Sequence, residues 1–450
     1  MDGYVGLAWG GVGSVQRVMV PKTDSFGPLL SERDLEAIVY STLAARSLDS
    51  ANVLMVVPDG TRTAPLRALF GSIHAHLQSR GSRMDILVAL GTHVAMTQDA
   101  IRERLGITPE ERSNAYSDVT FFNHAWNDPS ALESLGVLSA STIERLSGGR
   151  FAMDVPVTVN RKLGQYDHLL IVGPVFPHEV VGFSGGNKYL FPGVSGPEIL
   201  NFFHWLGAVI TSPALIGVAD TPVREVIDQA ARMVSTPKTA FCLVVDDGGI
   251  VGCHGGDVET AWRRATEQSG RTHVRIHDAP YRTVLACAPR MYDELWVGAK
   301  CMYKLEPVVA DGGELIIYAP HIRTLSATHG DAIRRIGYHC RDYFVEQWDR
   351  FRDEPWGILA HSTHVRGVGT YANGVERCRI QVTLATGIPE SECHAVGLGY
   401  RDPAGIVPEG WANRESEGIL MVPKAGEILH RLRNTPDWCR FPATPPADHQ

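Results

Sequence analysis

The sequence predicts an α/β protein of two domains, in which each domain is a mostly parallel sheet flanked by helices and the active site lies in the cleft between them. In the first half of the chain, short apolar runs alternate with amphipathic stretches of helical spacing. A second series of the same kind starts near Thr283. The chain of 450 residues is also too long for one compact core, which favours two domains.

The first series predicts three buried strands with helices between them. The strands are expected over residues 52–57, 84–90 and 168–173. The helices are expected over residues 65–80 and 97–105, with Thr63 as the cap of the first and with Gly81 and Gly106 at their ends. Because ligands of parallel sheets bind at the carboxyl ends of strands, the loops after the three strands should converge on one site.

The second series predicts a smaller unit of the same class. It contains a strand over 283–287, a helix near 295–309 and a strand over 314–318. The polar stretch 270–281 is the candidate hinge, so we predict one domain over 1–275 and a second over 280–400. The sequence leaves open whether the segment 400–450 returns to the first domain, and its end, 442–450, is expected to be disordered.

The composition argues against several functional classes. The net charge of −8 and the lack of basic runs disfavour nucleic-acid binding. No apolar run reaches the roughly 18 residues of a membrane span, and the N-terminus does not resemble a signal peptide. The eight cysteines are scattered without a C-x-x-C pair, which favours reduced thiols. We therefore expect a cytoplasmic protein that binds neither nucleic acid nor membranes.

The loops after the first two strands each carry a side chain suited to chemistry. In the loop 58–62, Arg62 follows Asp59 and Thr61, and its guanidinium matches a carboxylate or phosphate. In the loop 91–93, His93 has a pKa range suited to a general acid or base. Taken alone, the first loop is more typical of an ordinary surface turn with an exposed arginine, and most single histidines are simply surface or core residues.

The loop after the third strand is richer in chemistry. It holds His178, then Gly185 and Gly186, and then Lys188. A phosphate-binding Walker loop is excluded, because Lys188 is followed by tyrosine and not by serine or threonine. His204 lies sixteen residues after the lysine in an apolar stretch, where an imidazole is either a metal ligand or a satisfied core side chain.

Together these motifs resemble the lactate racemase family. The motifs are D-G-T-R from Asp59, G-T-H ending at His93, P-H-x-x-x-G-F-S-G-G-x-K ending at Lys188, and the later His204. The resemblance extends over most of the chain. It implies an isomerase that racemises or epimerises a 2-hydroxy acid with a covalently tethered nickel-pincer nucleotide, the nickel complex of pyridinium-3-thioamide-5-thiocarboxylic acid mononucleotide.

The resemblance also implies a role for each matched residue. Lys188 corresponds to the lysine that anchors the cofactor, His204 to the nickel ligand, His93 and His178 to the acid/base pair, and Arg62 to the group that holds the substrate carboxylate. The cofactor pocket of the first domain is further expected to include Asp59, Thr61, Gly185 and Gly186, with Trp356 as an aromatic cover.

The implied chemistry explains why these residue types are needed. One histidine takes the hydroxyl proton while the Cα hydride passes to the cofactor, which leaves a planar 2-keto acid. The hydride returns to either face, and the second histidine protonates the oxygen of the other enantiomer. The implied partners are a 2-hydroxy acid substrate and the enzymes that mature the cofactor.

The second domain departs from the family's lactate-specific pattern. Lys300 corresponds to a substrate-side lysine, but Val297 stands where the lactate enzyme has glutamine, and Val94 stands where it has arginine after the histidine. These changes border the expected substrate, so its identity stays open. His361 and His364 are expected in a surface loop, with contact to a larger and more polar substrate as the alternative.

Three other functions compete with this interpretation. An epimerase of a larger sugar acid or hydroxy-dicarboxylic acid keeps the same machinery. A non-catalytic nickel- or nucleotide-binding homologue keeps only the scaffold. A nicotinamide dehydrogenase is suggested by the glycines of 10–13, but no predicted strand precedes them, which disfavours it. The sequence determines neither the oligomeric state nor whether the cofactor is loaded.

Overall fold

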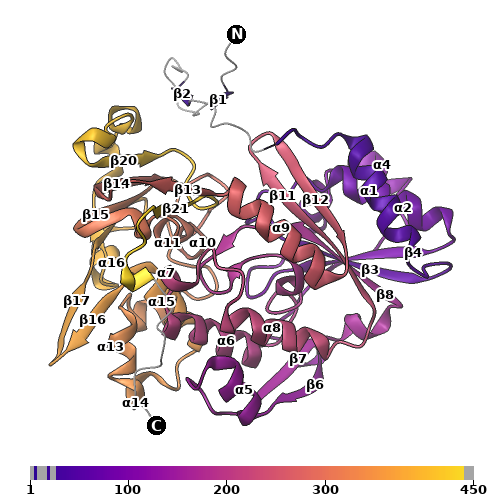
Figure 1. Ribbon diagram of the computed structural model, residues 1–450, viewed down its shortest axis with the longest axis horizontal. Helices are drawn as coiled ribbons and strands as arrows, with labels where there is room; N and C mark the ends of the chain where they lie inside the picture. Colours follow the sequence, from indigo (N-terminus) through magenta and orange to yellow (C-terminus); the bar gives the residue numbers. More distant parts are fainter. Residues whose placement is uncertain (1–4, 8–17, 21–26, 440–450) are drawn as a thin grey trace.

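The computed structural model describes residues 5–7, 18–20 and 27–439, and it contains two parallel sheets, each covered by helices. Figure 1 shows the first sheet, from indigo to magenta and rose, on one side of the molecule, and the second, mainly in brown, orange and yellow, on the other. The predicted fold class is confirmed. The glycines of 10–13 and the tail 442–450, on which two expectations rest, lie outside the described residues.

The first sheet has six strands in the order β12-β11-β8-β3-β4-β5, and only the pair β11–β12 is antiparallel. Its strands are β3 (Asn52–Pro58), β4 (Arg83–Ala89), β5 (Phe121–Asn123), β8 (His168–Pro174), β11 (Lys238–Asp246) and β12 (Gly249–Gly256). The three predicted strands are thus confirmed as β3, β4 and β8, which lie side by side and direct their carboxyl ends to one edge.

Nine α-helices and three two-stranded ribbons also occur in the described residues up to Thr272. The helices are α1 (Glu32–Ala44), α2 (Arg67–Ser79), α3 (Gln98–Arg104), α4 (Pro109–Ser113), α5 (Ala140–Ser147), α6 (Pro197–Ile210), α7 (Ser212–Leu215), α8 (Pro222–Arg232) and α9 (Val258–Thr272). The two-stranded ribbons are β1 (Val5–Leu7) with β2 (Val18–Val20), β6 (Leu132–Leu138) with β7 (Val155–Asn160), and β9 (Pro177–His178) with β10 (Gly182–Phe183).

The start of α2 differs from the prediction. Thr63 does not cap the helix, because its backbone N–H and its hydroxyl both donate to the carboxylate of Glu427, at 2.9 and 3.1 Å. The helix instead begins after Leu66, which forms no side-chain cap. Thr97 does cap α3 as its position suggests, by accepting a hydrogen bond from the backbone of Ala100.

The second sheet is wholly parallel, with the order β19-β18-β15-β14-β20. Its strands are β14 (Tyr281–Cys287), β15 (Val309–Ala319), β18 (Gln381–Thr386), β19 (Gly399–Tyr400) and β20 (Ile419–Val422). A hairpin joins β16 (Gly369–Ala372) to β17 (Val375–Cys378). The helices are α10 (Leu295–Gly298), α11 (Lys300–Tyr303), α12 (Gly330–Ile336), α13 (Arg341–Val345), α14 (Trp348–Phe351), α15 (Trp356–Arg366) and α16 (Glu390–Ala395).

One predicted helix of this half is wrong in detail, and the candidate hinge, which stays a prediction, contains regular secondary structure. The helix predicted near 295–309 is two short helices, α10 and α11, and a 3-10 turn at Glu306–Val308 follows them, where Pro307 cannot continue an α-helix. The stretch 270–281 is not a bare hinge, because α9 extends to Thr272 and the strand β13 (Val274–His277) pairs with β21 (Leu429–Leu432).

The described part of the segment 400–450 belongs to the second sheet and not to the first. The strand β20 pairs with β14 from Thr283 to Ala286. The segment still reaches across to the first half, since Glu427 holds Thr63 and Lys424 pairs with Asp247. The domain limits of 1–275 and 280–400 stay predictions.

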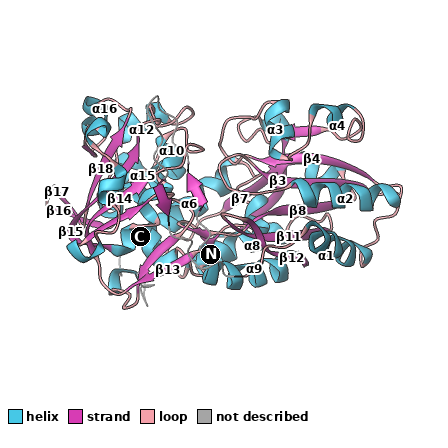
Figure 2. Cartoon of the chain, turned by 90° about the horizontal axis from the view of Figure 1, so that it is seen from above, coloured by secondary structure: helices cyan, strands magenta, loops and turns pink. Residues whose placement is uncertain are grey.

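Both faces of the first sheet are buried at its centre, which explains why its central strand β3 is apolar after Asn52. In β3, Leu54 and Val56 join the hydrophobic cluster on one face, while Val53, Met55 and Val57 join the cluster on the other. The second half has a core of its own. Figure 2 shows the two sheets side by side with α6 between them.

No helix in the described ranges is long and apolar enough to cross a membrane.

The conformation of Gly182 generates a stability prediction. Its φ of +84° is in the left-handed region, and a Cβ built on it would lie 1.8 Å from the carbonyl oxygen of Val218. Gly182→Ala should therefore destabilise the protein by about 3 kcal/mol or more, which for a chain of 450 residues corresponds to a fall of about 3 °C or more in the thermal midpoint.

Differential scanning calorimetry checks this value. Gly405→Ala is the matched control, because a Cβ there meets nothing within 4 Å and should change the midpoint by about 1 °C or less. Equal midpoints for the two variants would contradict the strained conformation of Gly182.

Candidate active site

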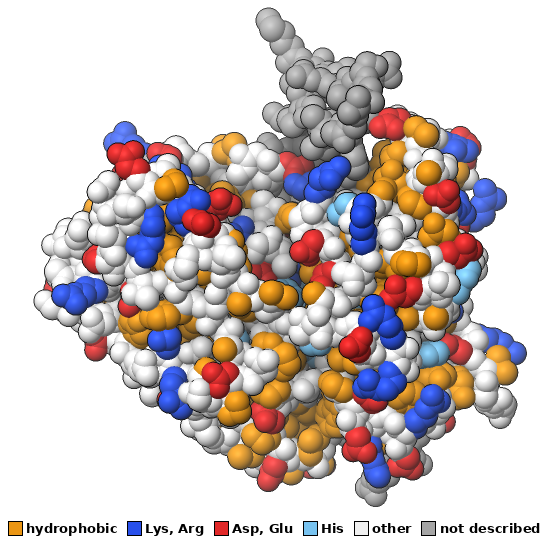
Figure 3. All heavy atoms as spheres, turned by 180° about the vertical axis from the view of Figure 1, so that it is seen from behind, with side chains coloured by type: hydrophobic (Ala, Val, Ile, Leu, Met, Phe, Trp, Pro, Cys, Tyr) orange, Lys and Arg blue, Asp and Glu red, His pale blue; other side chains and the backbone are white. Residues whose placement is uncertain are grey.

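A cavity of about 340 Å³ lies between the two halves of the molecule, where the loops after β3, β4 and β8 meet α10, α11 and α15. Nine of the predicted site residues line it: Asp59, Thr61, Arg62, His93, His178, Gly185, Lys188, His204 and Lys300. On the face drawn in Figure 3, histidine side chains are visible between the two halves, while acidic and basic side chains are interspersed around them. The convergence of the three loops, expected from the parallel sheet, is therefore observed.

Two predicted site residues do not line the cavity. Gly186 lies behind its wall, where an added Cβ would be 3.0 Å from both Arg224 and Trp262. Trp356 lines a separate hollow near Met153, and its indole N–H donates to the carbonyl of Arg352 at 2.9 Å. The tryptophans that line the cavity are Trp126 and Trp296. Of the two departures from the lactate pattern, Val297 lines the cavity, whereas Val94 does not and is 65% exposed.

Asp59 fixes the orientation of His93. Its carboxylate accepts hydrogen bonds from the backbone and hydroxyl of Thr61, at 3.1 and 2.7 Å, and its second oxygen is 2.5 Å from His93 Nδ1. Burial acts to raise the pKa of Asp59, but the charge and hydrogen bond of His93 outweigh it, so the pKa is lowered. An ionised Asp59 holds the proton of His93 on Nδ1, which leaves Nε2 with a lone pair.

His178 also has a carboxylate at its Nδ1 atom. This nitrogen accepts the backbone N–H of Val180 at 3.1 Å and lies 3.3 Å from an oxygen of Glu179. With Val180 as partner, the ring carries its proton on Nε2, and with Glu179 as partner it carries one on Nδ1. Burial, followed by the charges of Lys188 and Arg62, lowers the pKa of His178 well below its usual value.

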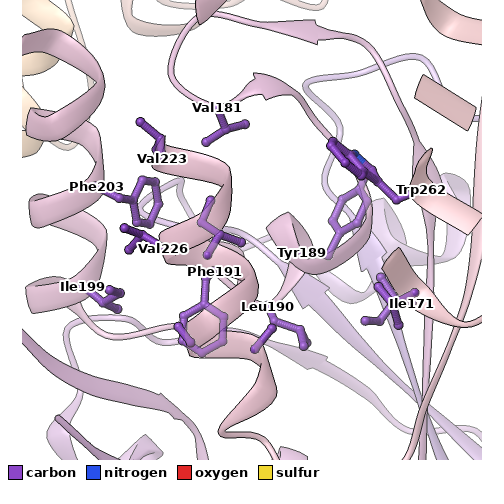
Figure 4. Close-up of a cluster of buried hydrophobic side chains, with 14 of the residues drawn as sticks. Ile171, Val181, Tyr189, Leu190, Phe191, Ile199, Phe203, Val223, Val226 and Trp262 are labelled. Carbon is purple, nitrogen blue, oxygen red and sulfur yellow. The ribbon is translucent and has the colours of Figure 1, made fainter. Parts of the chain in front are cut away.

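Lys188 is held by a loop that is anchored in the hydrophobic core. Its neighbours Tyr189, Leu190 and Phe191 are buried, and Figure 4 shows Tyr189 beside Trp262 and the rings of Phe191 and Phe203 directed into the same cluster. Burial, assisted by the charge of Arg62, lowers the pKa of Lys188 to about 7. A substantial fraction of this amine is therefore neutral, and nucleophilic, near neutral pH.

His204 has the tautomer of a metal ligand. It lies on α6 and its Nδ1–H donates to the carbonyl of Leu200, one turn earlier, at 2.7 Å. The Nε2 atom therefore carries a lone pair in the cavity. Burial lowers the pKa of His204 to about 4, so the ring stays neutral at physiological pH.

Positive groups from both halves surround these residues. Lys300 is buried and donates from Nζ to the carbonyl of Thr61 at 2.7 Å, which places it in the site and not on an exposed helix face. Burial, followed by the charge of Arg62, lowers the pKa of Lys300 to about 7. The guanidinium of Arg62 lines the cavity and has no hydrogen-bond partner among residues 27–439.

The structure adds cavity residues that the sequence did not single out. They are Trp126, Glu179, Trp296, Tyr303 and His329. The expectation of a surface loop for His361 and His364 is wrong, because both lie on α15, are buried, and line the cavity. A signal was present, since 358–365 holds no glycine, proline or formally charged side chain, as is typical of a helix buried on all sides.

Comparison with known proteins finds similarity to lactate racemases. The family profile described as the lactate racemase N-terminal domain matches residues 32–215, which include every predicted site residue from Asp59 to His204. Lactate racemase of Thermoanaerobacterium thermosaccharolyticum is 22% identical over 316 residues, or 68% of this chain and 70% of that protein. Lactate racemase of Lactiplantibacillus plantarum is 27% identical over 217 residues, but this match spans only 47% of this chain and 46% of that protein.

Residues 32–215 of the chain therefore form a lactate racemase N-terminal domain. The predictions of this family and of an isomerase are confirmed, since both named relatives are racemases. A Thermotoga maritima protein solved by the Northeast Structural Genomics Consortium is 32% identical, with a TM-score of 0.84 over 90% of this chain and 99% of that one. The lactate racemase apoprotein of T. thermosaccharolyticum shares the fold at 19% identity, with a TM-score of 0.68 over 95% of this chain and all of that one.

The environment of Lys188 generates a prediction about amine reactivity. With a pKa of about 7, Lys188 should be acylated by a small anhydride at a rate that is half-maximal near pH 7, far below the range of an ordinary lysine. Competitive labelling of the purified protein, followed by peptide mass spectrometry across pH 6–11, measures this rate.

Lys424 is the internal control for this experiment. Although partial burial lowers its pKa, the hydrogen bond and charge of Asp247 raise it overall, so its labelling should still increase above pH 10. Parallel pH profiles for the two lysines would show that the cavity does not lower the pKa of Lys188.

Proposed function

We propose that the protein is a racemase or epimerase of a 2-hydroxy acid, and that it acts through a nickel-pincer nucleotide attached to Lys188. The observation that carries this proposal is the pairing of two cavity histidines, His93 and His178, each with a carboxylate at Nδ1. Racemisation through a 2-keto acid must remove the hydroxyl proton of one enantiomer and return a proton to the oxygen of the other, and one acid/base group on each side of the substrate serves these two tasks.

The cavity residues fit the proposed cofactor. A covalent link through an amide-type bond requires an unprotonated amine, and the lowered pKa of Lys188 supplies one. A nickel ion needs a neutral imidazole with a free nitrogen, and His204 offers Nε2. At Gly185 the φ is +86° and a Cβ would lie 2.5 Å from a methyl carbon of Val175. Only glycine therefore fits at this position, and its backbone borders the cavity without a side chain.

The proposed substrate carboxylate binds to Arg62. A planar guanidinium without a protein partner matches a carboxylate in a bidentate manner. Lys300 adds positive charge from the second half, and its bond to the carbonyl of Thr61 holds it near Asp59. The 2-keto acid carries no covalent bond to the protein. These contacts would keep it in the cavity between its formation and its reduction.

His93 and His178 move the hydroxyl proton in this proposal. The O–H bond of one enantiomer breaks as its proton passes to Nε2 of the nearer histidine, whose new positive charge is stabilised by Asp59 or Glu179. When bound, the nucleotide would supply an acceptor and donor of hydride for C2 of the substrate, which passes through a planar 2-keto acid. The other histidine, which must carry a proton on Nε2 when the substrate binds, then gives that proton to the same oxygen and completes the opposite enantiomer. Exchange of protons with solvent returns the two rings to their starting states.

The proposal requires a 2-hydroxy acid and the enzymes that make the cofactor as partners. The cytoplasmic location stays a prediction.

Attachment of the cofactor tests the proposal directly. After co-expression with cofactor-maturation enzymes, the intact protein should gain the mass of one nucleotide on Lys188 and close to one nickel per chain. Lys188→Ala should carry no covalent adduct. Intact-protein mass spectrometry, peptide mapping and elemental analysis give these quantities.

A homologue that is loaded in the same cells serves as the positive control for maturation. An unmodified wild-type chain beside a loaded control, or an adduct that persists in Lys188→Ala, would refute the attachment.

The role of Asp59 generates a kinetic prediction. Asp59→Asn should lower kcat about 100-fold or more, because an amide neither fixes the Nδ1–H tautomer of His93 nor stabilises its imidazolium. Since the equilibrium constant is unchanged, kcat/KM must fall by the same factor in both directions. Polarimetry or chiral chromatography from each enantiomer measures the two rates.

Asp331→Asn is a suitable control, since Asp331 pairs with Arg334 on the surface and should leave the rates within about twofold. If Asp59→Asn kept the wild-type rates, the proposed acid/base role of His93 would be contradicted.

A further inference from the structure

Two histidines of α15 face the cavity without any hydrogen-bond partner. His361 and His364 are three residues apart and therefore lie on one face of the helix, with exposed fractions of 8% and 5%. In the part of the chain that the structure describes, neither ring forms a hydrogen bond, and the Nε2 atom of each is buried. A neutral imidazole always has one N–H donor and one lone pair, so buried polar groups of this kind normally have partners.

The ring contacts of both histidines are with aromatic side chains. The ring of His361 stacks on Trp296 with 4.0 Å between centroids, and that of His364 lies edge-on to Tyr303 at 6.2 Å. Val297 adds an apolar side chain to the same part of the lining. The other four cavity histidines each have one ring nitrogen engaged by the protein, which sets the pair on α15 apart.

Both rings are neutral at physiological pH. Burial lowers the pKa of His361 well below its usual value, assisted by the charges of His364 and His329, and burial lowers that of His364 to about 3. A neutral imidazole adds no positive charge to hold a second carboxylate. It also gains nothing from a methyl or phenyl group, whereas a hydroxyl group, both donor and acceptor, satisfies it.

We propose that His361 and His364 bind hydroxyl groups of the substrate beyond C2, so that the substrate is a polyhydroxylated 2-hydroxy acid of the aldonic acid class and not lactate. The inference rests on the proposed function, because it assigns the far end of the same substrate whose carboxylate Arg62 binds. It goes further by naming the substrate class and the residues of α15 that select it.

The experiment compares three substrates on the nickel-loaded enzyme. D-Gluconate carries a polyhydroxylated chain, malate a second carboxylate and lactate a methyl group. We expect the highest kcat/KM for gluconate. His361→Leu and His364→Leu should each lower kcat/KM for gluconate about 10- to 100-fold and lower the gluconate-to-lactate ratio by a similar factor. His364→Gln, which keeps a donor and an acceptor, should retain more of the ratio than His364→Leu.

A second readout separates substrate recognition from a structural role. Without substrate, leucine replaces a polar ring that has no partner, so both leucine variants should keep or raise the thermal midpoint. His76→Leu is the matched control, because His76 is also buried without a partner but lies on α2 and does not line the cavity. It should keep or raise the midpoint in the same way and leave kcat/KM for gluconate unchanged.

The outcomes distinguish this inference from the proposed function. A loaded enzyme that prefers lactate or malate, or leucine variants that keep the gluconate-to-lactate ratio, would overturn the inference and leave the racemase intact. A loaded protein that turns over none of the three acids would contradict the proposed function. In that case, calorimetric binding of gluconate to the wild type and to His361→Leu still decides the recognition, since equal affinities would overturn it.

Discussion

Helix α6 belongs to the hydrophobic cores of both halves, and the geometry of the cavity depends on this shared burial. Phe202, Phe203 and Leu206 pack into the core of the first sheet, while Trp205 and Ala208 pack into that of the second. Trp205 also stacks on Trp348, with 5.5 Å between ring centroids. A helix that is apolar on all sides is stable only when neighbours cover every face, so the two halves hold it between them.

The position of α6 determines what the cavity can contain. His204 lies on this helix, next to Phe203 and Trp205, and its backbone cannot move without disturbing both cores. Helix α15 packs against α6 and brings His361 and His364 to the same space. The side chains from the two halves therefore meet in a fixed arrangement, which a site built for positioning requires.

Burial also explains the electrostatics of the cavity. Lys188 and Lys300 come close to Arg62 in a space with little water, so both amines lose part of their preference for the charged form. Asp59 and Glu179 supply the balancing negative charge, each beside a histidine. Such an arrangement costs stability, which is typical of sites where perturbed pKa values serve chemistry.

Much of the first half could be predicted because its signals are local in the chain. The strands β3, β4 and β8 are apolar runs, and parallel strands direct the loops that follow them to one edge. Asp59, His93 and Lys188 lie in those loops, so sequence order alone predicted that they meet. Resemblance to a family then gave each a role that geometry alone does not assign.

Contacts between distant segments were beyond the sequence. Threonine is a common helix cap, yet the hydroxyl of Thr63 donates a hydrogen bond to Glu427, which lies near the far end of the chain. Trp356 is an aromatic residue suited to cover a cofactor, yet it lines a separate hollow with Met153, and Trp296 lines the cavity instead. Such contacts depend on how the two sheets pack against each other, and a local sequence pattern does not predict this packing.

By itself, the sequence determined the α/β class, the loops that bear the chemistry and the family, because strand periodicity and contiguous motifs are local properties. Only the tertiary structure decided that His361 and His364 are buried in the cavity, and that Lys300 donates to the carbonyl of Thr61. Burial and orientation arise when residues far apart in the chain pack together, so they exist only in the folded protein.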